Sequence, residues 1–442
     1  MHKTKLSPIV TGTLILTLAS FITRLIGFFY RMFLSSQFGE EGMGIYQLTS
    51  PVLALSYALC ISGFQTAISK FTAAEAGKGN RNNCVYVLFT GLFFSLFISI
   101  PCTALTYCNA DFISDVLLSE IRTAPLIRII ALSIPLSCIH SCFNGYYLGL
   151  KKAGISASAQ LLEQSVRVLC VFIIAQFLLK NGQTPSLSLA AVGLLAGEGA
   201  STLFSVLIFA GMSRKICAKD SSEYGSFIRS NFTCSIIKMA FIVNLNRIIV
   251  NLFASAETIL LPQSLEKSGL STQEALSVYG VLCGMVLPLL LFPNALTGSI
   301  SVMLLPAVSE ADEKNQKERI RSLTSRTFLF CFGLGILCMI FFLLTGNLLG
   351  QVMFSSETAG EYIVKLSFIC PLLYLSSALG SILNGKGKTI HCLITQVIGL
   401  IIRILFLLLF IPRYGIGAYI LGLIISQFIS TAMSMYFIKK YI

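Results

Sequence analysis

Long apolar runs follow one another along almost the whole chain, separated by short polar breaks. The runs are continuous rather than alternating at every second residue, which favours membrane helices over the strands of a barrel. A helix of ~20 apolar residues is long enough to cross a bilayer. We therefore predict twelve spans, divided by breaks such as Gly39–Gly42 and Gly77–Asn80. Their expected limits are 9–36, 43–69, 85–108, 123–147, 155–179, 186–212, 232–256, 275–305, 327–349, 359–383, 389–411 and 415–438.

Basic residues alternate between the breaks, which fixes an expected orientation. One set of segments, including both termini, carries 19 Lys and Arg residues, whereas the opposite set carries only four, Arg122, Lys180, Lys267 and Arg413. The positive-inside rule predicts that the basic set and both termini are cytoplasmic. The first apolar run is too long for a signal peptide and is expected to be retained as the first span.

The amino-acid composition is also that of an integral membrane protein. Hydrophobic residues make up 55% and charged residues 12% of the 442 residues, and the mean hydropathy is +0.82. Soluble domains contain about 25% charged residues, so this chain has too little polar surface to cover a water-exposed protein. The net charge is +13, and no nucleic-acid partner is expected.

The two halves of the chain resemble each other. In each half a span ends in Asn-Gly, and the next span carries a glutamine followed, seven residues on, by an arginine. The matched pairs are Asn144 with Asn384, Gln160 with Gln396, Arg167 with Arg403 and, more weakly, Arg24 with Arg247. Six spans per half give a parallel repeat, so we expect two six-helix lobes, 1–225 and 226–442, around a central cleft. Transporters place their substrate sites at such repeat interfaces.

Basic residues outnumber acids inside the predicted spans. The nine basic residues in or at the edge of a span are Arg24, Arg31, Lys70, Arg128, Arg167, Lys238, Arg247, Lys365 and Arg403. The acids in the interior of the spans are Glu163 and Glu198, with Glu361, at the start of the tenth span, counted with the acidic outer segments; the first and seventh spans are expected to hold none. An arginine at a span centre costs ~2.5–3.5 kcal/mol, so it should face water or a partner.

Position within the span separates these residues into two groups. Arg24, Arg167, Arg247 and Arg403 lie near the middle, whereas Arg31 lies near the outer end, where snorkelling to the surface is an alternative. Glu163 precedes Arg167 by four residues, which allows an ion pair on one helix face. Because guanidinium groups bind phosphate bidentately, the excess of arginine predicts an anionic, phosphorylated substrate.

Other site chemistries find little support in the sequence. The three histidines, His2, His140 and His391, are too few and too scattered to predict a metal or acid–base site. The cysteines form no C-x-x-C pair and are expected to be small buried hydrophobic residues. No G-x-x-x-x-G-K-[ST] loop is present. We therefore expect a transporter rather than an enzyme, with no cofactor and no direct use of ATP.

Several motifs resemble a known family. They are Gly12–Leu16, Ile22–Phe28 (ITRLIGF), Gly39–Tyr46 (GEEGMGIY), Ala67–Lys70 and Gln160–Arg167 (QLLEQSVR). These segments resemble the stage V sporulation protein B group, in the superfamily of multidrug, oligosaccharidyl-lipid and polysaccharide exporters, to which lipid II flippases are related. The resemblance implies a bacterial plasma-membrane flippase working by alternating access.

Under this resemblance the substrate is a polyprenyl-diphosphate-linked saccharide for the cell or spore envelope, moved to the outer leaflet. Arg24 and Arg31 match the first-span arginines that line the cleft in lipid II flippases. Membrane lipids and envelope-synthesis enzymes are the implied partners. Two alternatives stay open: a cation-coupled drug exporter with Glu163 and Glu198 as coupling acids, and a non-transporting scaffold of a division or sporulation complex.

Overall fold

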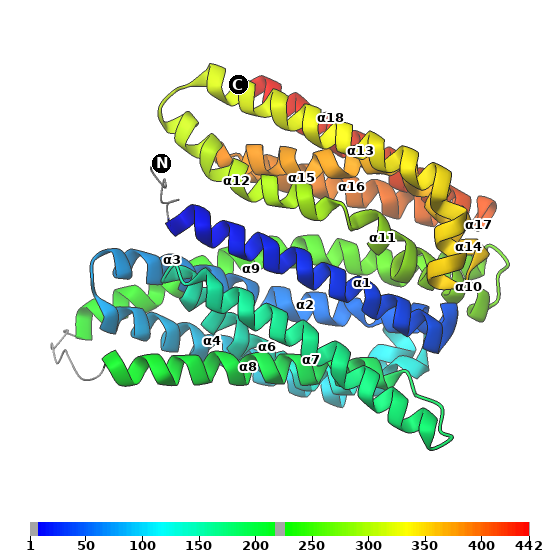
Figure 1. The fold of residues 1–442 in the computed structure, drawn as a ribbon, viewed down its shortest axis with the longest axis horizontal. Coiled ribbons are helices and arrows are strands. Elements are labelled where there is room, and N and C mark those ends of the chain that lie inside the picture. The colour runs from blue at the N-terminus through cyan, green and yellow to red at the C-terminus, as the bar shows by residue number, and fades with distance from the viewer. Residues whose placement is uncertain (1–7, 217–225, 442) are drawn as a thin grey trace, which may run out of the picture. The chain divides into compact units, whose positions relative to one another are not determined.

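The computed structural model describes residues 8–216 and 226–441, and these are almost entirely helical (Figure 1). No strand occurs within these ranges. The helices of the first half are α1 (Pro8–Leu48), α2 (Ser50–Cys60), α3 (Ser62–Gly77), α4 (Arg81–Cys108), α5 (Ala110–Phe112), η1 (Ile113–Leu117), η2 (Ile121–Thr123), α6 (Ala124–Gly149), α7 (Ala153–Lys180) and α8 (Ser188–Ile216). Those of the second half are α9 (Ser226–Lys267), α10 (Thr272–Tyr279), η3 (Gly280–Val286), α11 (Leu287–Leu291), α12 (Asn294–Glu313), α13 (Lys317–Phe354), α14 (Glu357–Leu366), η4 (Ser367–Ile369), α15 (Cys370–Gly385), α16 (Thr389–Leu409), α17 (Ile411–Tyr414) and α18 (Ile416–Tyr441).

The helices confirm the prediction of an all-α integral membrane protein. In the described ranges, 11 stretches are long and apolar enough to cross a bilayer. The first of them, Leu14–Gly77, is 64 residues long and contains two predicted spans. Gly39 interrupts its helical backbone with a φ of 66°, a conformation that glycine adopts without steric cost. The 11 stretches therefore accommodate the twelve predicted spans.

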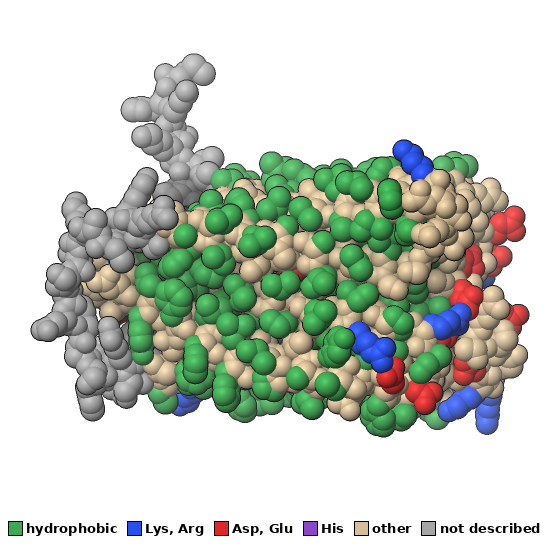
Figure 2. Space-filling view, turned by 90° about the horizontal axis from the view of Figure 1, so that it is seen from below, with side chains coloured by type: hydrophobic (Ala, Val, Ile, Leu, Met, Phe, Trp, Pro, Cys, Tyr) green, Lys and Arg blue, Asp and Glu red, His purple; other side chains and the backbone are tan. Residues whose placement is uncertain are grey.

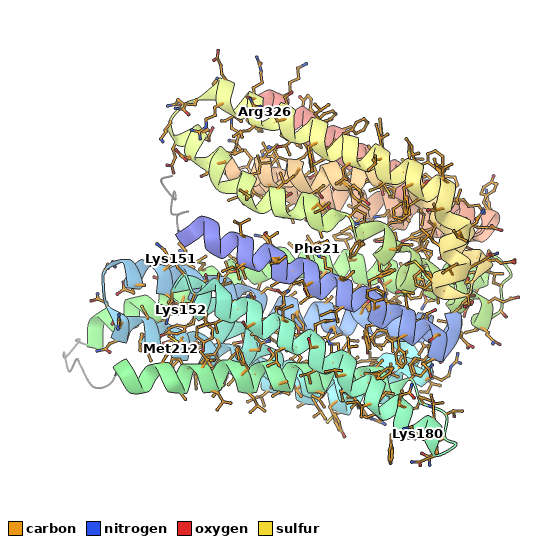
Figure 3. All side chains as sticks on the ribbon, in the orientation of Figure 1. Phe21, Lys151, Lys152, Lys180, Met212 and Arg326 are labelled. Carbon is orange, nitrogen blue, oxygen red and sulfur yellow. The ribbon has the colours of Figure 1, made fainter. Side chains whose placement is uncertain are left out.

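The outer surface has the polarity of a lipid-facing protein. Figure 2 shows hydrophobic side chains over the middle of one face, with Lys, Arg, Asp and Glu gathered near one end. Large apolar side chains such as Phe97 and Leu207 are more than 60% exposed. Along α7, Lys151 and Lys152 lie just before one end and Lys180 at the other, on either side of the apolar stretch (Figure 3). Such exposed apolar area requires lipid rather than water around it.

By packing, the chain divides into two compact units. Unit 1 is drawn from Met1–Gly27 and Thr49–Leu252, and unit 2 from Phe28–Leu48 and Phe253–Ile442. Both α1 and α9 therefore contribute residues to both units. The lobes 1–225 and 226–442 describe the sequence repeat, which a division by packing does not test, and they stay a prediction.

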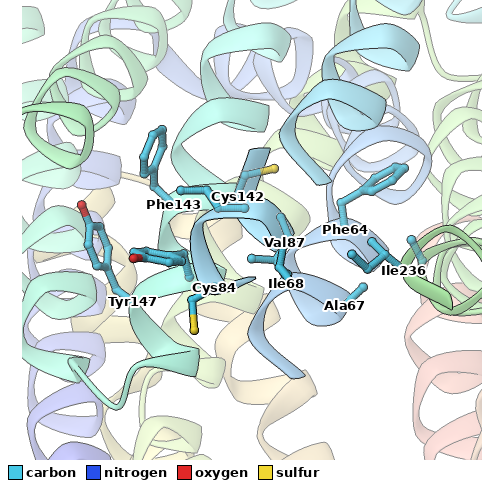
Figure 4. Packing of buried hydrophobic residues seen from close by; sticks show 12 residues of the cluster. Phe64, Ala67, Ile68, Cys84, Val87, Cys142, Phe143, Tyr147 and Ile236 are labelled. Carbon is cyan, nitrogen blue, oxygen red and sulfur yellow. The ribbon is translucent and has the colours of Figure 1, made fainter. Parts of the chain in front are cut away.

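A hydrophobic cluster holds unit 1 together (Figure 4). It joins α3 through Phe64 and Ile68, α4 through Val87, α6 through Tyr147, and α9 through Ile236. Gly145 lets α6 approach α3 closely, because a Cβ there would lie 2.5 Å from a backbone carbonyl oxygen of α3. Close backbone contact at small residues is the usual basis of helix association in membranes.

A second cluster holds unit 2 together. It contains Leu304 and Val308 of α12, Cys331 of α13, Leu379 of α15 and Ile438 of α18. The cysteines of the described residues are free, and Cys60, Cys138 and Cys331 are buried, as expected for small hydrophobic side chains.

Candidate substrate and coupling site

Two acids and a histidine meet inside unit 1. His140 of α6 places Nδ1 3.6 Å from Glu198 Oε2 of α8 and 3.8 Å from Glu163 Oε2 of α7. One nitrogen of His140 and one carboxylate oxygen of each glutamate all lie within 4.8 Å of one another. His140 and Glu198 are buried, and Glu163 is partly buried. Such a group can exchange a proton or hold a cation.

Hydrogen bonds from neighbouring side chains hold Glu198 and His140 in place. The Tyr57 hydroxyl of α2 donates to Glu198 Oε1 over 2.5 Å, and the Ser201 hydroxyl lies 2.5 Å from His140 Nδ1. Glu198 Oε2 is buried and makes no hydrogen bond to any described residue. One carboxylate oxygen of Glu198 is therefore held by Tyr57, and the other faces His140.

Arg167 neutralises the second acid. Its Nη2 lies 2.5 Å from Glu163 Oε1, the i, i+4 pair that the sequence allowed. Helix α8 packs tightly against this turn of α7: a Cβ at Gly197 would lie 2.8 Å from the Glu163 carbonyl oxygen, and one at Gly193 would lie 3.1 Å from that of Arg167. Because both positions are glycine, Glu198 of α8 can come within reach of Glu163.

Unit 2 contains a second arginine–carboxylate–tyrosine cluster. Glu257 of α9 lies 3.2 Å from Arg403 Nη1 of α16 and accepts a 2.7 Å hydrogen bond from the Tyr419 hydroxyl of α18. Arg31 of α1, also in unit 2, directs Nη1 toward the Gly284 carbonyl oxygen, 3.4 Å away. This cluster pairs one guanidinium group with one carboxylate, whereas the unit 1 cluster has two carboxylates for one guanidinium.

One expectation from the sequence is wrong at these clusters. The seventh span was expected to hold no acid, but its apolar stretch extends over Thr233–Lys267, and Glu257 is buried in it. The predicted limit at 256 placed Glu257 just outside the span; the apolar run Ile259–Leu261 just after it was the signal for a longer one. The three histidines are expected to be too few and too scattered for a metal or acid–base site, and this stays a prediction. Packing of α6 against α7 and α8 nevertheless places His140 beside Glu163 and Glu198, a proximity that the sequence did not indicate.

The remaining predicted arginines have a different environment. Arg24 of α1 and Arg247 of α9 both belong to unit 1, are exposed, and form no ion pair with a described acid. The structure thus pairs two of the five candidates with acids, Arg167 with Glu163 and Arg403 with Glu257. Arg31 contacts a backbone carbonyl, and Arg24 and Arg247 form no ion pair with a described acid. At the edge of the spans, Arg128 forms an exposed ion pair with Asp111 at 2.6 Å.

The fold defines the class of protein first. An inward-facing multidrug resistance MATE family transporter of the MOP superfamily superposes with a TM-score of 0.75 at 14% identity, covering 94% of this chain and 93% of the other. An inward closed lipid II flippase MurJ superposes with a TM-score of 0.69, also at 14% identity, covering 96% and 87%. The chain has the fold of a multi-pass membrane transporter.

The family follows from the sequence. Residues 9–311 match the family of polysaccharide biosynthesis proteins, and the chain belongs to this family. It is 27% identical to stage V sporulation protein B of Bacillus subtilis (strain 168), covering 97% of this chain and 83% of that protein. It is 25% identical to the lipid II flippase MurJ of the same organism, over 39% of this chain and 34% of the flippase. The predicted resemblance is confirmed, and the chain belongs with flippase-type transporters rather than with enzymes.

Proposed function

We propose that this protein moves an anionic, polyprenyl-diphosphate-linked saccharide from the cytoplasmic to the outer leaflet of the bacterial plasma membrane. The family and the name of its flippase relative support a lipid-linked saccharide as the substrate class. Both termini are then cytoplasmic, in agreement with the basic segments that include them. Enzymes that build or polymerise envelope saccharides are the proposed partners.

The observation that carries the proposal is the state of Arg24 and Arg247. Each lies in a helix long enough to span the membrane, and each is exposed without an acid partner among the described residues. An unpaired guanidinium in lipid is costly, so the two side chains require water or an anionic ligand during the working cycle. A diphosphate supplies two adjacent anionic groups for bidentate binding.

Alternating access requires helices that can change their course. Pro51, Pro288 and Pro371 each stand within the first two residues of a helix, directly after an interruption of the preceding one. Pro135 lies inside α6. Because proline removes a backbone hydrogen bond, these four positions are the proposed bending points.

Flipping in proteoliposomes tests the proposal. The probe is a fluorescent undecaprenyl-diphosphate disaccharide, whose outer-leaflet fraction is measured by quenching with dithionite. We expect Arg24→Gln and Arg247→Gln each to slow flipping at least tenfold. Arg128→Gln removes an equally charged side chain at the edge of a span and should flip at the wild-type rate. Wild-type flipping by the first two variants, with normal insertion, would refute the assignment of these arginines to the diphosphate.

A second candidate, a cation-coupled exporter, is favoured by one observation. The His140–Glu163–Glu198 group places two carboxylates and an imidazole within 4.8 Å of one another in unit 1. Such a site can take up a proton or a monovalent cation on one side of the membrane and release it on the other. If Glu198→Gln abolishes efflux of cationic dyes from whole cells while saccharide flipping is unaffected, the exporter is the better description. If the same substitution removes only the dependence of flipping on a cation gradient, the group couples the proposed flippase.

A further inference from the structure

A cavity at one end of unit 2 combines cationic and apolar walls. Its volume is about 290 Å³, and it lies among α13, α15 and α18. Its lining residues are Arg321, Thr324, Ser325, Phe328, Leu379, Met435, Ile438 and Lys439. Figure 3 locates the N-terminal part of α13 by the label on Arg326. The lining contains two positive charges and no acid.

The walls follow a gradient of polarity along the helices. On α13 the lining changes from Arg321 through the hydroxyls of Thr324 and Ser325 to the ring of Phe328. On α18 it changes in the opposite chain direction, from Lys439 to Met435. The cations lie outside the predicted limits of the spans, and the apolar residues lie inside them. The cavity therefore crosses the level at which lipid headgroups meet acyl chains.

Neighbouring charges at the same end of unit 2 are engaged in ion pairs, whereas those of the cavity are not. Lys314 and Arg319 lie within 4.0 Å of Glu310, and Lys386 lies 3.3 Å from Asp312. Arg321 and Lys439 are exposed and make no ion pair with a described acid. Two cations beside a cavity without a carboxylate leave a local positive charge that an anionic ligand can neutralise.

We propose that this cavity binds an anionic glycerophospholipid of the surrounding leaflet. Arg321 and Lys439 bind the phosphate, and the Ser325 hydroxyl donates to one of its oxygens. The Thr324 hydroxyl, which donates to the Ile320 carbonyl at 2.8 Å, accepts from the glycerol hydroxyl, and the apolar wall receives the first carbons of an acyl chain. About 290 Å³ is too small for a whole lipid and is at the low end for ligand cavities, so only the headgroup and chain start enter. Binding here is separate from the proposed transport, because neither Arg24 nor Arg247 lines the cavity.

Thermal stability of the purified full chain in detergent tests this inference. The probes are dioctanoyl phosphatidylglycerol, dioctanoyl phosphatidylcholine and inorganic phosphate at equal concentrations. We expect phosphatidylglycerol alone to raise the melting temperature of the wild type, saturably. Arg321→Gln/Lys439→Gln should require at least tenfold more phosphatidylglycerol for half of the effect. Lys317→Gln/Lys440→Gln removes the same charge from the same two helices and should respond as the wild type does.

A third variant separates binding from general surface charge. Ser325→Trp fills the cavity from its exposed rim while keeping both cations, and it should also lose the response. Melting temperatures without lipid, matched to the wild type, establish that each variant is folded. An equal shift with phosphatidylcholine, an equal shift with inorganic phosphate, or an unchanged response of Arg321→Gln/Lys439→Gln would each overturn the lipid site.

Discussion

Removal of Arg167 should destabilise unit 1 strongly, because the residue balances one of two adjacent carboxylates. Arg167 lies 2.5 Å from Glu163 Oε1, and the side chains of the pair are 17% and 19% exposed. One carboxylate oxygen of Glu163 and one of Glu198 lie within 4.8 Å of each other, and at an effective dielectric constant of about 20 two charges at this separation repel by about 3.5 kcal/mol. Breaking a buried pair by removing one partner costs about 3–5 kcal/mol.

We therefore expect Arg167→Gln to lower the free energy of unfolding by about 3–5 kcal/mol. In a unit of this size each kcal/mol lowers the melting temperature by about 2–4 °C, which predicts a decrease of at least ~6 °C. The double variant Arg167→Gln/Glu163→Gln removes both charges and should recover most of that loss. A buried pair deleted as a whole is often close to neutral.

The assay follows from the composition of the chain. Tryptophan is absent, but 14 cysteines are present, and Cys60, Cys138 and Cys142 are buried in unit 1. A thiol-reactive coumarin maleimide becomes fluorescent as these side chains are exposed on heating. Arg128→Gln breaks an ion pair whose side chains are 43% and 63% exposed, and it should change stability by less than about 1 kcal/mol. The electrostatic reasoning is refuted if Arg167→Gln and Arg128→Gln have the same melting temperature. It is also refuted if the melting temperature of the double variant is no higher than that of Arg167→Gln.

Three further outcomes are expected. Gly145→Ala places a Cβ 2.5 Å from a backbone carbonyl oxygen and should lower the free energy of unfolding by about 1–3 kcal/mol. At Gly211 of α8 an added Cβ meets nothing within 4 Å, so Gly211→Ala should raise the free energy of unfolding by up to about 1 kcal/mol. Thermal unfolding followed with the maleimide dye measures both changes. Tyr419→Phe removes a 2.7 Å hydrogen bond to a buried carboxylate and should lower the free energy of unfolding by about 1.5–3 kcal/mol. An unchanged melting temperature would show that this hydroxyl does not stabilise the cluster. Burial favours the neutral form of Glu120, but hydrogen bonds and charge from Arg122 outweigh it and hold the pKa below its ordinary value. The pair therefore stabilises the fold above the ordinary pKa of about 4.3 and loses this effect as the pH falls through the lowered pKa, so Arg122→Gln should flatten the melting-temperature profile between about pH 3 and 5.

The positions of Arg167 in α7 and Arg403 in α16 show how much of the repeat between the two halves could be predicted from the sequence. Arg167 lies 14 residues after the first residue of α7, and Arg403 lies 14 residues after the first residue of α16. The Gln-x6-Arg spacing in the sequence therefore corresponds to equal positions in two helices. The acids that meet these arginines do not repeat: Glu163 comes from the same helix as Arg167, whereas Glu257 comes from α9. No spacing rule connects residues 257 and 403, since only packing of distant helices brings them together.

Hydrophobicity, length and loop charge determined the class of this protein without any structure. Because backbone groups in lipid must be satisfied within the helix, an apolar run of ~20 residues has essentially one conformation, and the span count follows from the sequence alone. The Arg167–Glu163 pair was equally local, because i and i+4 share a helix face. Tertiary structure decided which charges are met by a partner. It brought His140 and Glu198 to Glu163, and Glu257 to Arg403 and Tyr419, while Arg24 and Arg247 were left exposed. These contacts join helices far apart in the chain, and their formation depends on how small residues let the helices approach one another.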